Sequence, residues 1–229
     1  SFAVLTEPEG SIAAVRLDRR EHGTCLAEVT LADVKKGQTF LFRWESHVLV
    51  RPSAPSPIPP GIKLPVEGVP TEVARWLQPT WCCDAKDPEI RKVADELLRD
   101  KPTADALIPA LLESMAGIFQ KARERGVNLT ATEAMTKQGS CTSCANVGAA
   151  LLRACGIPAR IIAGYPTWSA ALQTHYVVEY WLPGCGWRVM ETTMCQDDPA
   201  GCEQIEVAIV VPEDEAQERG AGDHGGGHL

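Results

Sequence analysis

Apolar and polar residues alternate in short runs along the first part of the chain. The runs are AVLTE, AAVRL, CLAEVTL, TFLFRW and HVLV, and Glu-Gly, His-Gly and Lys-Gly-Gln turn signals separate them. A period of two is typical of half-buried strands. The pattern therefore predicts a small antiparallel β module over residues 1–51.

A change of composition follows this module. Seven prolines fall within residues 52–70, too many for a helix or a central strand. The pattern predicts a proline-rich linker over residues 52–75, and it places the main domain at residues 76–212.

The main domain begins with helical periodicity. Asp87 and Pro88 have the residue types of an N-cap and a first helical turn, and apolar residues then recur at helical spacing. A second helix is expected from about Thr103 to Arg125, and Thr130 with Glu133 forms a short capping box. A last helix is expected to begin at Cys141 and to end before Gly156 and Pro158.

After this helix the period returns to two. Strands are predicted at residues 160–165, 175–182, 187–192 and 205–211, with a hairpin turn over 183–186. Helices followed by strands favour an α+β fold with an antiparallel sheet. The polar, glycine-rich end, residues 213–229, is predicted to be a flexible tail.

Composition and charge limit the classes of partner. The 229 residues carry a net charge of −8 without a prominent basic cluster, which argues against nucleic acid and against an anionic membrane surface. No apolar run reaches the roughly 18 residues of a membrane span. The oligomeric state is left open.

Cysteine usage bears on the compartment. The nine cysteines are an odd number, so an exported protein would keep at least one free thiol. The alternative is a cytosolic protein with buried thiols. The chain has neither an initiating Met nor a leader, and we expect that it was processed or shortened, so localisation stays open with a lean to a periplasmic or secreted protein.

Cys141 has the most informative position in the sequence. It lies at the expected start of an apolar helix, where partial positive charge and unpaired N–H groups favour a thiolate. His175 follows in one predicted strand and Glu191 in another. The order of cysteine, histidine and acid suggests nucleophilic thiol catalysis of acyl transfer, with His175 as the base and Glu191 as its orienting acid. Glu179 lies on the same face of the predicted strand as His175, and it competes for the orienting role.

The sequence Cys141-Thr-Ser-Cys144 also permits other chemistry. It could form a redox dithiol, or it could bind zinc together with Cys195, Cys202 or the Cys82-Cys83 pair. A redox motif of this kind ordinarily follows a buried strand, and zinc would need a second closely spaced pair. We therefore expect neither a metal ion nor a cofactor.

These motifs resemble the transglutaminase-like superfamily of papain-type thiol enzymes. The resemblance covers roughly residues 77–195 and rests on GSC with Ala145, on LLRACGIPARIIAGY, on His175 to Glu179, and on LPGCGW with Glu191. It implies a papain-like core, preceded by a β-sandwich-like module, of the bacterial type. It also implies a triad of Cys141, His175 and Glu191, in which Glu191 stands at the family's aspartate position and Val177 at a usual tryptophan.

The implied chemistry is attack of the Cys141 thiolate on an amide of a protein or peptide, giving a thioester. Water then completes hydrolysis, and an amine completes transamidation. The Cys141 N–H, together with Gln138, is the candidate oxyanion donor. The alternatives are a catalytically inactive binding module of the same fold and a CxxC redox or zinc protein.

Overall fold

The computed structural model of this protein describes residues 5–7, 12–19, 25–37, 41–43, 56–121, 129–137, 139–167, 173–197 and 204–210. The chain divides into two compact units, Ser1–Arg51 and Pro52–Leu229. In the first unit, β2 (Ile12–Arg19) pairs antiparallel with β3 (Cys25–Leu31), and β1 (Leu5–Glu7) with β4 (Leu41–Arg43). The predicted small β module is therefore present, although the run HVLV lies outside the described residues.

The proline-rich segment belongs to the second unit and makes contacts with the rest of it that a free linker would lack. The Leu64 N–H donates to the Pro102 carbonyl at 3.0 Å, and the Val66 N–H donates to the Gly156 carbonyl at 3.1 Å. Residues further along are helical, in α1 (Thr71–Ala74) and the 3-10 helix η2 (Arg75–Leu77). Leu64 and Val66 can pair in this way because, unlike the prolines around them, each keeps a backbone donor.

The next helices along the chain follow the predicted pattern. They are α2 (Pro88–Asp100), α3 (Ala104–Lys121), α4 (Ala131–Ala134) and α5 (Cys141–Ala154). The Asp87 side chain accepts hydrogen bonds from two N–H groups of the first turn of α2, and Thr130 and Glu133 form the expected capping box of α4. Helix α3 includes Pro109, and its predicted continuation to Arg125 lies outside the described residues. No helix in the described part of the chain combines the length and the hydropathy that crossing a bilayer requires.

The strands of the second unit form one antiparallel sheet within the described residues. Its order is β8-β7-β6-β5-β9, made from β5 (Ala159–Pro166), β6 (His175–Leu182), β7 (Gly186–Glu191), β8 (Gln196–Asp197) and β9 (Gln204–Val210). The four longer strands agree with the prediction to within about one residue at each end, and the turn joining β6 to β7 is also confirmed. The predicted α+β fold is thus correct, and the short β8 is an addition to it.

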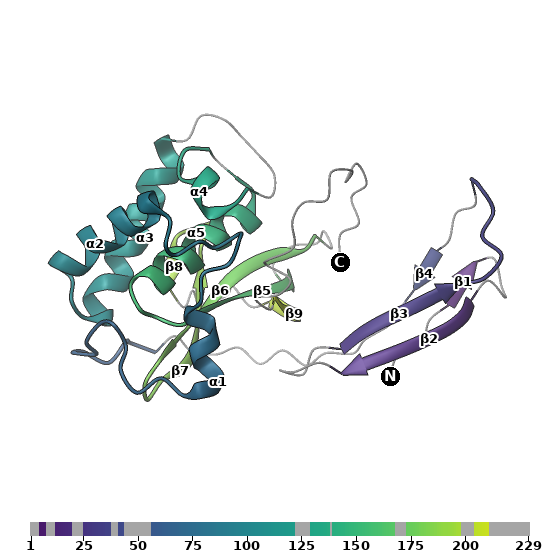
Figure 1. Cartoon of the computed structure of the whole chain (residues 1–229), viewed down its shortest axis with the longest axis horizontal. Coiled ribbons are helices and arrows are strands. Elements are labelled where there is room, and N and C mark those ends of the chain that lie inside the picture. The colour runs from purple at the N-terminus through teal and green to yellow at the C-terminus, as the bar shows by residue number, and fades with distance from the viewer. Residues whose placement is uncertain are drawn as a thin grey trace. The chain divides into compact units, whose positions relative to one another are not determined.

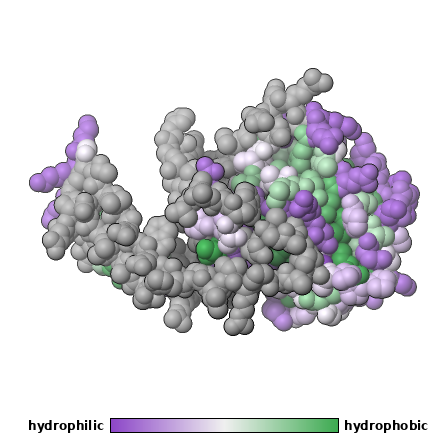
Figure 2. All heavy atoms as spheres, turned by 180° about the vertical axis from the view of Figure 1, so that it is seen from behind, coloured by the Kyte–Doolittle hydropathy of each residue, from purple (hydrophilic) through white to green (hydrophobic). Residues whose placement is uncertain are grey.

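Helices α2 to α5 gather on one side of this sheet (Figure 1). The residues buried between them are the apolar side chains of α2, α3 and α5 and one face of the strands, including Ile90, Leu107, Leu111, Met115, Leu151, Leu152, Ile161, Val178 and Met190. On the face of the second unit seen in Figure 2, hydrophobic residues form a band bordered by hydrophilic residues. Burial of the apolar side chains between the helices and the sheet supplies the main driving force that holds α5 against β5 and β6.

Helix α5 lies close to the sheet because Gly148 has no side chain. A Cβ on Gly148 would lie 2.7 Å from Cγ2 of the fully buried Thr192, which directly follows β7. Such an approach is below any ordinary carbon contact, and a buried β-branched side chain has little freedom to yield. Gly148 thus sets the spacing between the helix that begins at Cys141 and the strand that ends at Glu191.

We predict that Gly148→Ala lowers the free energy of unfolding by about 1–2 kcal/mol, because overpacking a tight core costs about that much. Gly117→Ala is the matched control, since a Cβ on Gly117, inside α3, meets nothing within 4 Å. That variant should gain about 0.5–1 kcal/mol from helix propensity. Urea unfolding of both variants measures the difference, and equal stability changes would contradict the close-packing argument.

Candidate active site

Cys141 is the first residue of α5, as the sequence predicts. The preceding Ser140 has extended backbone angles and its side chain makes no capping hydrogen bond. The first N–H groups of this 14-residue helix have no partners within the helix, so they create a positive local field around the half-buried thiol. Cys141 therefore has the helix-terminus environment that favours a thiolate.

Gly139 allows the chain to enter α5 in this way. A Cβ on Gly139 would lie 2.0 Å from the Ser143 Cβ, within the first turn of the helix. The Ser143 hydroxyl in turn accepts a hydrogen bond from the Leu129 N–H at 2.9 Å. Because Gly139 has no side chain, the backbone before Cys141 can pack directly against Ser143 in the first turn of α5.

His175 and Glu191 meet as predicted. His175 is the first residue of β6 and Glu191 the last of β7, and Nε2 of the imidazole lies 2.6 Å from Oε2 of the carboxylate. The His175 side chain is 14% exposed and that of Glu191 is 1% exposed, so water screens the pair weakly. The antiparallel pairing of β6 with β7, which sets Val178 opposite Met190, brings these two strand ends together.

The second carboxylate oxygen of Glu191 is also held. The Thr193 N–H, two residues along the chain, donates to Oε1 at 2.8 Å. The carboxylate is therefore fixed at both oxygens, one by a backbone donor and one by His175. This contact was not predicted, because a backbone N–H leaves no signal in residue type.

His175 connects the thiol and the carboxylate. Its hydrogen bond with Cys141, followed by that with Glu191, raises the pKa of His175 to about 9. For Cys141, burial raises the pKa, but hydrogen bonds from His175 and from the Tyr176 N–H outweigh it, and the pKa falls below its ordinary value. Both directions favour the pairing of a thiolate with an imidazolium, beside a buried carboxylate.

The second cysteine of the CTSC sequence has the opposite character. Cys144 is 5% exposed, and burial followed by the nearby Cys195 raises its pKa to about 12. Both cysteines are free thiols. A buried thiol with a raised pKa is unreactive, so the geometry separates Cys141 from Cys144 as two different kinds of cysteine.

Glu179, the competing candidate, does not pair with His175. Its Oε2 accepts a hydrogen bond from Nε of Arg160 at 2.7 Å, and a second guanidinium nitrogen lies at 2.6 Å. The Arg160 guanidinium also stacks 4.0 Å from the ring centroid of Trp187. Arg160 thus holds Glu179 in a separate ion pair, and Glu191 is the acid that contacts the histidine.

Two residues named in the sequence analysis lie outside the described part of the chain. Gln138, the candidate oxyanion donor, is not among the described residues, and neither is Cys202, one candidate zinc ligand. Within the described part of the chain, no group of three or more His, Cys, Asp or Glu side chains is arranged to hold a metal ion.

Comparison with known proteins addresses the identity of this arrangement. The family profile of the "Transglutaminase-like superfamily" matches residues 91–192, a range that includes Cys141, His175 and Glu191. Residues 91–192 of the chain are therefore similar to a transglutaminase-like domain. The resemblance inferred from the sequence motifs is therefore confirmed.

One curated relative and two solved structures are also similar to this chain. A protein-glutamine gamma-glutamyltransferase of Pseudomonas aeruginosa is 33% identical over 122 residues, which cover 47% of this chain and 18% of that protein. A crystal structure of a "putative cysteine protease" from Cytophaga hutchinsonii aligns with a TM-score of 0.67 over 93% of this chain and 71% of the other, at 16% identity. The periplasmic domain of TgpA from Pseudomonas aeruginosa aligns over 56% of this chain and 49% of its own, with a TM-score of 0.43 and 26% identity.

These similarities differ in how much of each protein they cover. The Cytophaga structure shares the fold of the transglutaminase-like domain. The chain spans less than a fifth of the length of the curated transferase.

We predict that Glu191→Gln lowers the pKa of His175, because an amide cannot stabilise the imidazolium as a carboxylate does. Glu179→Gln is the matched control, since Glu179 pairs with Arg160 and not with His175. An NMR titration of the His175 ring protons measures both variants. A pKa that stays near 9 in Glu191→Gln would contradict the assigned contact.

Proposed function

We propose that this transglutaminase-like domain catalyses thiol-dependent acyl transfer or hydrolysis at amide bonds of proteins or peptides. Cys141 is the nucleophile, His175 the general acid and base, and Glu191 the carboxylate that orients His175. The main support is the contact chain in which His175 touches the Cys141 thiol and lies 2.6 Å from Glu191. Family membership supports an enzyme of this general class.

In the first half-reaction, the Cys141 thiolate attacks the amide carbonyl carbon and a C–S bond forms. The carbonyl oxygen becomes an oxyanion, for which the Cys141 N–H at the start of α5 is the proposed donor, with Gln138 as a second candidate. The His175 imidazolium then donates its proton to the leaving nitrogen as the C–N bond breaks. A thioester and a neutral imidazole remain.

In the second half-reaction, neutral His175 removes a proton from water or from an amine as that group attacks the thioester. The C–S bond breaks and the thiolate is regenerated beside the imidazolium. Water gives hydrolysis and an amine gives transamidation. The name of the Pseudomonas relative favours a glutamine side-chain amide as the acyl donor.

Glutamate suits the position that the family usually fills with aspartate. The side chain is one methylene longer, but Thr193 and His175 hold its two oxygens, so the added bond does not leave the carboxylate free to rotate. This double restraint supports a functional triad over an inactive binding module.

We predict that Cys141→Ser abolishes acyl-enzyme formation, while Cys144→Ser keeps most of it. The reason is that Cys141 has a lowered pKa and Cys144 a pKa of about 12. The assay incubates a glutamine-containing peptide with and without a primary amine, and mass spectrometry detects the thioester, released ammonia, incorporated amine and cleaved peptide. Equal losses in both variants would contradict this assignment and favour the dithiol alternative.

We predict that kcat/KM falls above about pH 9, where His175 loses the proton that the leaving amine needs. On the acid side, activity should fall only below the ordinary thiol pKa, because the contacts with His175 and the Tyr176 N–H lower the pKa of the Cys141 thiol. A pH profile of initial rates tests both limbs. Activity that rises steadily through pH 9 and beyond would indicate an ordinary thiol rather than an ion pair.

A further inference from the structure

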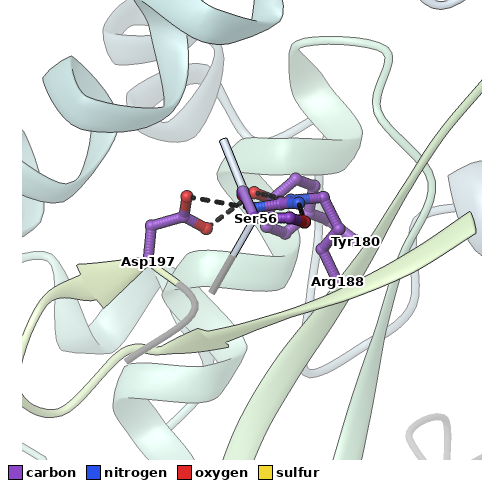
Figure 3. Close-up of polar contacts among 4 residues, drawn as sticks. All are labelled: Ser56, Tyr180, Arg188 and Asp197. Carbon is purple, nitrogen blue, oxygen red and sulfur yellow. Dashed lines mark hydrogen bonds and ion pairs between the residues drawn. The ribbon is translucent and has the colours of Figure 1, made fainter. Parts of the chain in front are cut away.

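A second polar cluster lies on the sheet, outside the candidate triad. We call Ser56, Tyr180, Arg188 and Asp197 the Arg188 cluster, and their side chains converge in Figure 3. The Tyr180 hydroxyl donates to Oδ1 of Asp197 at 2.6 Å and accepts from Nε of Arg188 at 3.0 Å. Tyr180 is fully buried and Arg188 is 7% exposed. These contacts are therefore weakly screened and costly to disrupt.

The cluster spans three neighbouring strands. Tyr180 on β6 lies directly opposite Arg188 on β7, and Asp197 on β8 lies opposite Met190 on β7. Arg188 and Met190 share a face of β7 because successive side chains alternate. Asp197 is thus a diagonal neighbour of Arg188, and a guanidinium nitrogen lies 3.6 Å from its Oδ2.

Strand β8 needs this anchor because it is short. It has two residues, and it lies at the edge of the sheet, so its ladder with β7 supplies few hydrogen bonds. The Asp197 side chain adds a part-buried hydrogen bond from Tyr180 and an ion pair with Arg188. The position of β8 therefore depends on side-chain contacts as well as on backbone pairing.

The chain between β7 and β8 contains the donor that holds the triad carboxylate. Glu191 pairs with Gln196 across the two strands, and residues 192–195 form the connecting loop. Within that loop the Thr193 N–H donates to Oε1 of Glu191. Where β8 lies thus determines where the loop presents this donor.

We propose that Asp197, held by Tyr180 and Arg188, is a positioning residue for Glu191. It fixes β8, and through β8 the Thr193 N–H, so that the Glu191 carboxylate faces His175. The effect passes from the Arg188 cluster to the imidazolium and from there to the Cys141 thiolate. This inference rests on the proposed function, in which Glu191 orients His175.

The fourth member of the cluster provides a control. Arg188 donates from Nη1 to the Ser56 hydroxyl at 3.0 Å and from Nη2 to the Ser56 carbonyl at 2.8 Å. These bonds secure the start of the second unit and do not lie on the path from Asp197 to Glu191. Ser56→Ala removes one of them and leaves the contacts of Asp197 in place.

The test compares four variants of the full chain: Tyr180→Phe, Asp197→Asn, Ser56→Ala and, as a reference, Glu191→Gln. Alkylation of Cys141 by iodoacetamide is followed from pH 4 to 10 by mass spectrometry of the Cys141 peptide, and near-ultraviolet circular dichroism checks folding. We expect Tyr180→Phe and Asp197→Asn to slow alkylation at pH 7 by about three- to tenfold and to move its midpoint upward. Ser56→Ala should match the native profile, and Glu191→Gln should be shifted at least as far as Tyr180→Phe.

The outcomes separate the two proposals. If Glu191→Gln is shifted while Tyr180→Phe and Asp197→Asn match the native profile, the positioning role is overturned and the triad stands. If Glu191→Gln itself leaves the profile unchanged, the orienting role of Glu191 in the proposed function fails. A shift in Ser56→Ala as large as that in Tyr180→Phe would indicate general loosening and would also overturn the positioning role. Tyr180→Phe removes a single oxygen, so it decides the question if Asp197→Asn does not fold.

Discussion

The buried carboxylate of Glu191 is the constraint around which the site is organised. A carboxylate with almost no contact with water is strongly destabilising unless cations and hydrogen-bond donors surround it. Here one oxygen accepts from the Thr193 N–H and the other lies 2.6 Å from the His175 ring. Because the carboxylate prefers a charged partner, it favours the imidazolium, and the imidazolium in turn favours the Cys141 thiolate. The charge of the Glu191 carboxylate therefore favours deprotonation of the Cys141 thiol through His175.

That chain of contacts works only if a helix terminus and two strand ends meet at one place. The apolar core beneath α5 presses the helix against β5 and β6, and Gly148 lets it approach the residue that follows Glu191. The pairing of β6 with β7 then brings His175 and Glu191 into contact. Packing and electrostatics are thus coupled, since a change in the spacing between α5 and the sheet would move the thiol away from the pair.

The sequence was sufficient to predict the elements that local chemistry determines. The capping residue Asp87, the capping box at Thr130 and the apolar periods predicted the helix starts and the longer strands to within about a residue. Cys141 and His175 were identifiable because a helix-terminal cysteine followed by a histidine in a strand is chemically unusual. The choice between Glu191 and Glu179 was less determined, because both lie in strands near the histidine. Arg160 decides it by pairing with Glu179, a contact between residues on different strands.

The contacts that sequence reasoning missed are those without a signature in residue type or local spacing. The Thr193 N–H is a backbone donor, and Ser56 meets Arg188 across 132 residues of sequence. Strand β8, with two residues, is too short to produce a periodic pattern. These features lie around Glu191, the member of the proposed triad that departs from the usual aspartate. A longer side chain has one more rotatable bond, so it needs more restraint to hold one orientation. The loop donor meets that need directly, and Tyr180 and Arg188 contact Asp197 on the short strand that follows the loop.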